Sequence, residues 1–228
     1  MSSCSIFVGV SIIYRYRLRN NLRDIAKYFK KKWKETGSDK DKEFFYWMSS
    51  IDKYVPDSMD GGLFAQTADS DIITNTTTET SIIGEGVGNL TVPAYEFRKG
   101  DSFELHMHGD ISSLNNETLE IRLRNNGDVL ATTSPITMVS TSGNGYDLRA
   151  TFVVREVGEA GTAQLMTSGM FQYTKSSNNT PEAIDFDNLE STNFNTHENN
   201  TLDITVEWGS ADPGNAIDSH VLNLYKIF

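Results

Sequence analysis

The 228-residue sequence contains a single cysteine, Cys4. One cysteine cannot build an internal disulfide framework or a cysteine-based zinc site. The sequence also lacks the ~20 consecutive apolar residues that a membrane-spanning helix needs. Its most apolar run, residues 5–14, has no positive charge before it and no small-residue cleavage site after it, unlike a secretory signal. We expect this run to form a short buried strand, with a signal anchor as the weaker alternative.

Motifs typical of catalytic chemistry are also missing. There is no G-x-S-x-G elbow to present a nucleophilic serine. The glycine-rich segment 84–88 precedes no helical pattern, so it does not predict a phosphate-binding loop, and we interpret it as a turn between strands. We therefore expect a protein that is not an enzyme and that uses no cofactor.

Only one pair of histidines lies close together in the sequence. His106 and His108 alternate with apolar residues, so on a strand they share one face with Glu104, as in a metal-binding H-x-H pair. With Gly100 the pair matches half of the cupin pattern G-x5-H-x-H, but serines occupy the positions of its glutamate and no second half follows. We expect no metal site, and we keep these three side chains as weak candidate ligands for a cupin-like alternative.

Charge is distributed unevenly along the chain, whose net charge is -11. Residues 1–56 carry 12 Lys+Arg and 6 Asp+Glu, a net charge of +6. The remaining residues carry 8 Lys+Arg and 25 Asp+Glu, a net charge of -17. Such asymmetry indicates a basic segment that meets an anionic partner, joined to an acidic body that repels nucleic acid.

Nine basic residues are concentrated in one short stretch, opposed only by Asp24: Arg15, Arg17, Arg19, Arg23, Lys27, Lys30, Lys31, Lys32 and Lys34. Docking of this stretch to a partner protein, or to the body of the chain itself, is the interpretation that we favour. Contact with an anionic membrane through a basic amphipathic helix is a second interpretation. Contact with nucleic-acid phosphates is a third.

Apolar residues within the basic stretch have helical spacing. They fall on one stripe of a helix and would dock it against a neighbour: Leu18, Leu22, Ile25, Phe29 and Trp33. Gly37 can end this helix, and a second apolar stripe runs from Phe44 to Val55, before Pro56. The pattern predicts a helical hairpin over residues 1–56, which serves as a basic anchor, followed by a linker over residues 57–62.

From residue 63 onward the apolar residues alternate with polar ones. Alternation predicts strands at 102–108, 118–124, 148–156, 163–173, 202–208 and 221–227, and shorter ones at 72–75, 81–83, 90–92 and 129–132. Turn-forming residues stand at 125–128, 142–145 and 212–215. About ten short strands without helical patterns predict that residues 63–228 form an antiparallel β-sandwich of jelly-roll type.

One long polar segment, residues 178–200, interrupts the strand pattern. It is long enough to bind a calcium ion, a sugar or a neighbouring subunit, and it contains Phe186 and Phe194. We expect it to be a surface loop whose two phenylalanines pack against a partner chain.

Several ordered blocks of the C-terminal region carry a family resemblance. They are LFAQTADS at 63–70, GVGNLTVP at 86–93, GDSF at 100–103, VEWGS at 206–210, SH at 219–220 and LYK at 224–226. Residues 63–228 thereby resemble the jelly-roll head domains of phage tail-fibre-like proteins and of capsid-surface proteins in large DNA viruses. The fibrous shaft of such fibres is missing from this sequence, which favours a minor capsid or short-spike role.

The resemblance implies a structural protein located in the virion. It implies a homotrimer that contacts other capsid or virion proteins and displays a head that can bind a host glycan, with residues 1–56 as the attachment end. Two other roles stay open beside the cupin-like alternative. One is a capsid-forming jelly roll whose basic segment binds the packaged genome, and the other is a glycan-binding module on a cell surface.

Overall fold

The computed structural model describes residues 28, 30–32, 34–37, 40, 42, 62–176, 179–188, 190–191 and 193–228. The chain divides into two compact units, Met1–Gly61 and Gly62–Phe228. In the first unit the described residues are helical except for Gly37, whose φ of +64° is the left-handed conformation in which helices often end. The predicted strand at 5–14, the five apolar docking residues and the predicted second stripe lie outside the described residues.

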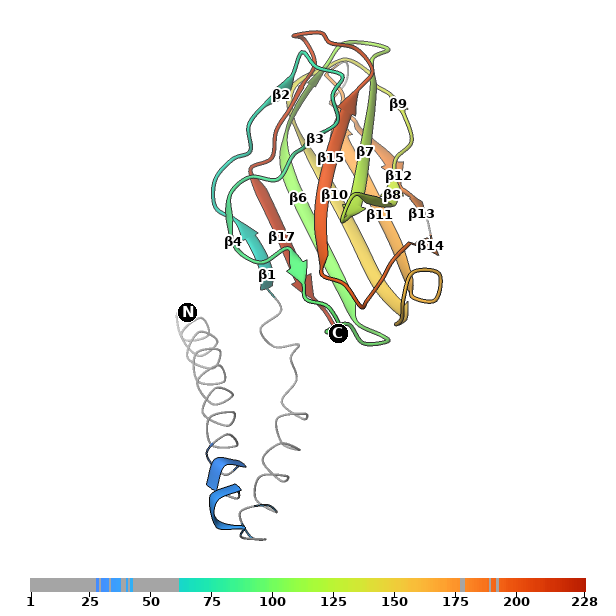
Figure 1. Cartoon of the computed structure of the whole chain (residues 1–228). Coiled ribbons are helices and arrows are strands. Elements are labelled where there is room, and N and C mark those ends of the chain that lie inside the picture. Colours follow the sequence, from blue (N-terminus) through green and yellow to red (C-terminus); the bar gives the residue numbers. More distant parts are fainter. Residues whose placement is uncertain are drawn as a thin grey trace, which may run out of the picture. The chain divides into compact units, whose positions relative to one another are not determined.

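The second unit consists of two antiparallel sheets, as the sequence predicts (Figure 1). Sheet A has the order β12 (Pro181–Asp185), β11 (Gln164–Thr174), β10 (Thr141–Glu156), β6 (Ser102–Ser113), β17 (Val221–Lys226), β1 (Gly62–Gln66) and β4 (Gly86–Gly88). In the same sheet, β14 (Glu190–Ser191) pairs with β11, and β16 (Ala216–Ile217) pairs with both β6 and β2 (Ile73–Thr74).

Sheet B has the order β13 (Asp187–Asn188), β8 (Asp128–Thr132), β7 (Thr118–Asn125), β15 (Asn200–Trp208) and β3 (Thr80–Ser81). Two short strands extend it, since β5 (Thr91–Val92) pairs with β15 and β9 (Ile136–Thr137) pairs with β7. The two sheets face each other as the two layers of a β-sandwich (Figure 1).

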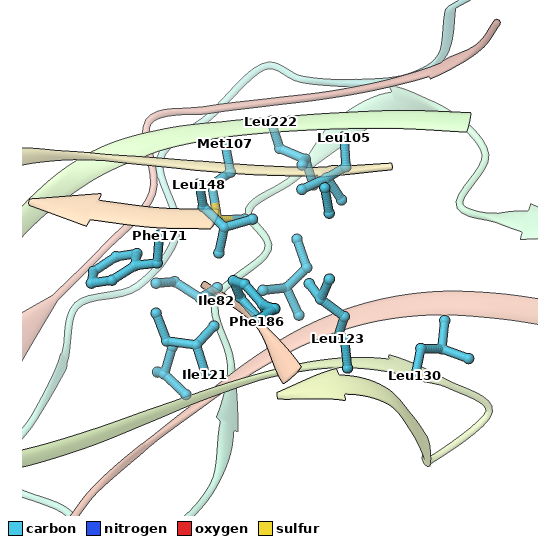
Figure 2. Close-up of a cluster of buried hydrophobic side chains, with 14 of the residues drawn as sticks. Ile82, Leu105, Met107, Ile121, Leu123, Leu130, Leu148, Phe171, Phe186 and Leu222 are labelled. Atoms are coloured by element: carbon cyan, nitrogen blue, oxygen red, sulfur yellow. The ribbon is translucent and has the colours of Figure 1, made fainter. Parts of the chain in front are cut away.

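The core lies between the sheets and is built from the alternating apolar residues. Leu105 and Met107 of β6 meet Ile121 and Leu123 of β7 across this space, and all four are at most 1% exposed (Figure 2). Each such side chain contributes about 1.5–3 kcal/mol through removal of apolar surface from water. The predicted inward residues of these two strands are therefore confirmed as core.

The predicted turn at residues 142–145 is wrong, because this segment belongs to β10. Thr141 pairs with Ser113 and Asn144 with Ile111, so three steps along β10 match two along β6. The extra residue forms a β-bulge, and Gly143 within it has a φ of +55°. Turn-forming residues therefore distort a long strand here without ending it.

The expected packing of Phe186 and Phe194 against a partner chain is also wrong. Phe186 is 3% exposed and lies in the core of its own chain (Figure 2). Phe194 is 1% exposed and belongs to the same core. The segment around them is paired rather than looped out, since β12 and β14 add to sheet A and β13 adds to sheet B. Likewise, the segment interpreted as a turn at 84–88 contains β4, which pairs with β1.

Candidate functional site

The outward face of β6 carries the three predicted candidate ligands. Along this strand Phe103, Leu105 and Met107 are buried, while Glu104 and His108 are exposed. His106 lies between these two on the same face and is half-buried. The predicted sharing of one face by the three side chains is thus what strand alternation produces.

His106 is held by a carboxylate of the neighbouring strand. Its Nε2 lies 2.7 Å from Oδ1 of Asp147 on β10. The second oxygen of Asp147 accepts a hydrogen bond of 3.0 Å from Nε of Arg149 and lies 2.9 Å from its Nη2. Register explains the geometry: Arg149 stands opposite His106, so Asp147 reaches His106 along a diagonal of the sheet.

The other two candidate ligands do not take part in this hydrogen-bonded group. The side chains of His108 and Glu104 make no hydrogen bond or ion pair with any residue that the structure describes. In the described part of the chain, no group of three or more His, Cys, Asp or Glu side chains is arranged to hold a metal ion. The two histidines of the H-x-H pair thus differ: His106 is hydrogen-bonded to Asp147, and the side chain of His108 is exposed.

A second histidine cluster, which the sequence does not predict, lies in sheet A near the start of β17. Nδ1 of His220 lies 3.3 Å from Oδ1 of Asp69, and its Nε2 lies 3.3 Å from Oδ1 of Asp218 and 3.8 Å from Oδ2 of Asp110. The imidazole is 38% exposed. Carboxylates on both sides hold the ring in place, so the cluster suits structural pairing.

Close backbone packing brings these residues together. A Cβ on Gly109 would lie 2.0 Å from the carbonyl oxygen of Asp218, so only glycine lets the 218–219 segment approach β6. Ser219, which is fully buried, donates 2.6 Å from its Oγ to the carbonyl of Ile82, and Gln66 Nε2 donates 2.8 Å to the Ser219 carbonyl. No spacing in the sequence predicts this cluster, because four separate segments supply its residues.

The outer face of sheet B carries a network of charged side chains. Glu79 accepts hydrogen bonds from Nε of Arg124 at 2.5 Å and from its Nη2 at 2.8 Å, and Nη1 of Arg122 lies 3.0 Å from Glu79 Oε2. Arg122 also donates 2.6 Å to Glu207 and pairs with Glu120. The network joins β7 and β15 to the segment before β3.

These contacts shift the pKa of two groups in opposite directions. Burial alone would raise the pKa of Glu79, but the hydrogen bonds from Arg124 and Thr205 and the charges of both arginines hold it below its usual value. Burial alone would lower the pKa of Arg122, but the hydrogen bond to Glu207 and the nearby carboxylates raise it. Both groups are therefore ionised at neutral pH, and their role is to hold strands together.

Four of the nine predicted basic residues lie within the described part of the chain. Lys30, Lys31 and Lys34 are exposed on the helical segment and Lys32 is half-buried. Nζ of Lys31 lies 3.9 Å from Glu35 one turn on, and Nζ of Lys32 lies 5.9 Å from the centre of the Tyr28 ring. The other five, Arg15, Arg17, Arg19, Arg23 and Lys27, lie outside the described residues.

Among the described residues, no helix is long and apolar enough to cross a membrane. No protein-family model matches the chain, and no curated protein matches it either.

Proposed function

We propose that this chain is a structural protein of a virus particle, in which residues 63–228 form a jelly-roll head and the basic N-terminal segment attaches the head to the particle. The head mediates attachment or contacts with other capsid proteins. The order of the strands is the observation that carries this proposal.

Eight strands of the sandwich pair as nested partners. The first strand, β1, pairs with the last, β17; β3 pairs with β15; β6 pairs with β10; and β7 pairs with β8 in the centre of the chain. Folding a long double-stranded ribbon upon itself gives this nesting, and the ribbon rolls up into two facing sheets. Jelly rolls have this architecture, which recurs in viral capsid and lectin domains.

Additional strands, inserted into this eight-strand arrangement, widen sheet A. The hairpin of β11 and β12 lies beyond β10, and β4 lies beyond β1. The outward face of the widened sheet carries Glu104, His108 and the His106–Asp147–Arg149 group. A broad polar face supports a role in contact between proteins or with glycans.

Mass spectrometry of virus particles, purified to constant composition from the culture that expresses the chain, tests this role. We expect peptides from both 1–56 and 63–228 at a fixed ratio to the major capsid protein. Native mass of the isolated chain should give three times 25.5 kDa, the mass of one chain. A chain that is abundant in the culture but absent from the particles would contradict the proposal.

The attachment role of the basic segment needs its own variant. Replacement of Lys30, Lys31, Lys32 and Lys34 by Glu should abolish incorporation into particles and leave the unfolding of the head unchanged. The control replaces Lys99 by Glu, an exposed base on the head, and should be incorporated normally. If the isolated chain binds DNA or RNA through these lysines, and the binding falls steeply with salt, genome binding replaces attachment as the function of the segment.

A further inference from the structure

A cavity of about 310 Å³ lies between the two sheets within the second unit. Phe103, Phe152 and Leu224 of sheet A form one wall, and Leu130 and Leu202 of sheet B form the opposite wall. Leu130 also stands at the margin of the core cluster in Figure 2. The segment from β4 to β5, including Leu90, also lines the cavity.

None of the described residues that line this cavity has a charged side chain, although 22% of all residues are charged. An apolar cavity of about 150 Å³ is known to bind benzene. Twice that volume accommodates roughly ten to twelve carbon atoms on the same scale, and it reaches the lower end of the range for ligand pockets. Size and lining together select an uncharged, largely hydrocarbon occupant.

The side-chain oxygen of Asn125, in the wall, receives no hydrogen bond from any described residue. Asn200, which is 4% exposed, donates from Nδ2 to the carbonyls of Asn195 at 2.9 Å and Glu198 at 2.7 Å. Its Oδ1 is therefore left to accept the 2.7 Å hydrogen bond from Nδ2 of Asn125. This fixes the amide of Asn125, which is 7% exposed and lines the cavity, and no described residue donates to its Oδ1.

We propose that the cavity binds a neutral molecule of about ten carbon atoms that carries one hydroxyl group, and that this hydroxyl donates to Oδ1 of Asn125. A carboxylate of the same length would lose its hydration without meeting an opposite charge. A peptide segment would bring several backbone donors and acceptors that this wall cannot satisfy. The binding site is independent of the proposed role in a virus particle.

Fluorescence of N-phenyl-1-naphthylamine, a neutral apolar dye, tests the proposal with the full chain. The dye should show saturable enhancement with one site per chain. At pH 8, 1-decanol should displace the dye at a concentration at least about tenfold lower than the concentration of decanoate that is needed. The reason is that the decanoate carboxylate would lose its hydration in the cavity, whereas the neutral alcohol carries no charge to desolvate. 1-Methoxydecane, which cannot donate a hydrogen bond, should compete several-fold more weakly than 1-decanol.

Variants with a larger side chain in the cavity test whether the dye binds there. Leu90→Trp and Leu202→Trp should each weaken dye binding at least about tenfold, because the indole occupies the space of the ligand. Leu114→Trp is the control, since Leu114 is 43% exposed and lies outside the cavity. Thermal unfolding of each variant identifies any that fail to fold.

A ligand-induced rise in stability gives a measurement that needs no variant. 1-Decanol should raise the Tm of the unmodified chain and decanoate should not, because a ligand that binds the folded state stabilises it. Three results would overturn the proposal: no saturable dye binding, equal effects of 1-decanol and decanoate, or full binding by both folded tryptophan variants.

Discussion

Two tyrosines in the same core differ in the hydrogen bonding of their hydroxyl groups. Tyr173 is 1% exposed, and its Oη accepts a hydrogen bond of 3.1 Å from the backbone N–H of Val139. Tyr146 is 2% exposed, and its Oη has no partner among the described residues. Burial, followed by the charges of Asp218 and Asp110, raises the pKa of Tyr146, so its phenol stays neutral.

We therefore expect opposite effects from removing the two hydroxyls. Tyr146→Phe should leave the free energy of unfolding unchanged or raise it by up to about 1 kcal/mol, because an unpaired buried polar group is lost. Tyr173→Phe should lower it by about 1 kcal/mol, because the N–H of Val139 loses its acceptor. Urea unfolding of both variants checks this, and a larger loss for Tyr146→Phe would contradict it.

Glu79 leads to a prediction about pH. Its pKa in the folded state lies below the usual 4.5, so its contribution to stability is present above that pH and is lost as the pH falls through the folded-state pKa. Glu79→Gln should lower the free energy of unfolding at pH 7 by about 1–2 kcal/mol, and the difference from the unmodified chain should shrink toward pH 3.

The control for Glu79 is Glu85→Gln. Glu85 is exposed, and its side chain makes no hydrogen bond or ion pair with a described residue. Urea unfolding at several pH values should show almost no change for this variant. If the free energy of unfolding of Glu79→Gln differs from that of the unmodified chain by the same amount at every pH, the effect of the substitution comes from packing and not from the charge of Glu79.

For single residues, the sequence predicts on which face of a strand a side chain lies, but it does not predict which residues that side chain contacts. Alternation along 102–108 places His106 on the outward face, as observed. The partner Asp147 depends on the register between β6 and β10, which a bulge shifts at residues 141–144. His220 depends on four segments, so its surroundings are decided only by the complete topology.

Strands with strong alternation are the elements that the sequence predicts best. The six long predicted strands all occur, and the predicted turn at 125–128 joins β7 to β8 with Asn126 and Gly127 both at positive φ. Among the two-residue strands, β2 and β5 lie within the predicted strands 72–75 and 90–92, and β3 overlaps the predicted strand 81–83. The sequence does not predict β9, β12, β13, β14 and β16, because so short a segment has no period of its own. Tertiary pairing, not local preference, makes them extended.

The segment that contains Phe186 gives a prediction for one element. Phe186 packs inside its own chain next to β11, where its N–H donates 3.0 Å to the carbonyl of Gly169 (Figure 2). Phe186→Ala should lower the free energy of unfolding by about 3–4 kcal/mol and leave the oligomeric state of the folded fraction unchanged.

Phe228→Ala is the matched control, because Phe228 is 75% exposed. It should change the free energy of unfolding by less than about 0.5 kcal/mol. Denaturant unfolding and native mass are measured on both variants. A folded Phe186→Ala chain of normal stability but altered native mass would restore the partner-contact interpretation.

For the whole molecule, the sequence predicts the class of fold, but it does not predict which strands lie next to one another in each sheet. Alternation with turns predicts an antiparallel sandwich, and the two sheets confirm it. Nothing local indicates that β17 lies between β6 and β1, since the partners Gly62 and Tyr225 are at opposite ends of the second unit. Arrangements of this kind depend on the summed packing of both sheets.

The position of β17 yields a prediction for the whole fold. Deletion of residues 221–228 should leave the chain unfolded, because sheet A then loses a central strand and with it Leu222 and Leu224 of the core. Deletion of residues 227–228 alone should keep the fold, since these two lie beyond β17. Circular dichroism and limited proteolysis distinguish the outcomes, and a protease-resistant 1–220 chain would contradict the expectation.

The same central strand constrains how the protein is made. A nascent chain that emerges from the ribosome holds β1 and β6 long before residues 221–226 leave the exit tunnel. Until then both strands present unpaired edges, which are sites for aggregation. Sheet A therefore cannot be completed until β17 is available, and chaperones that cover the two edges in the meantime would limit aggregation.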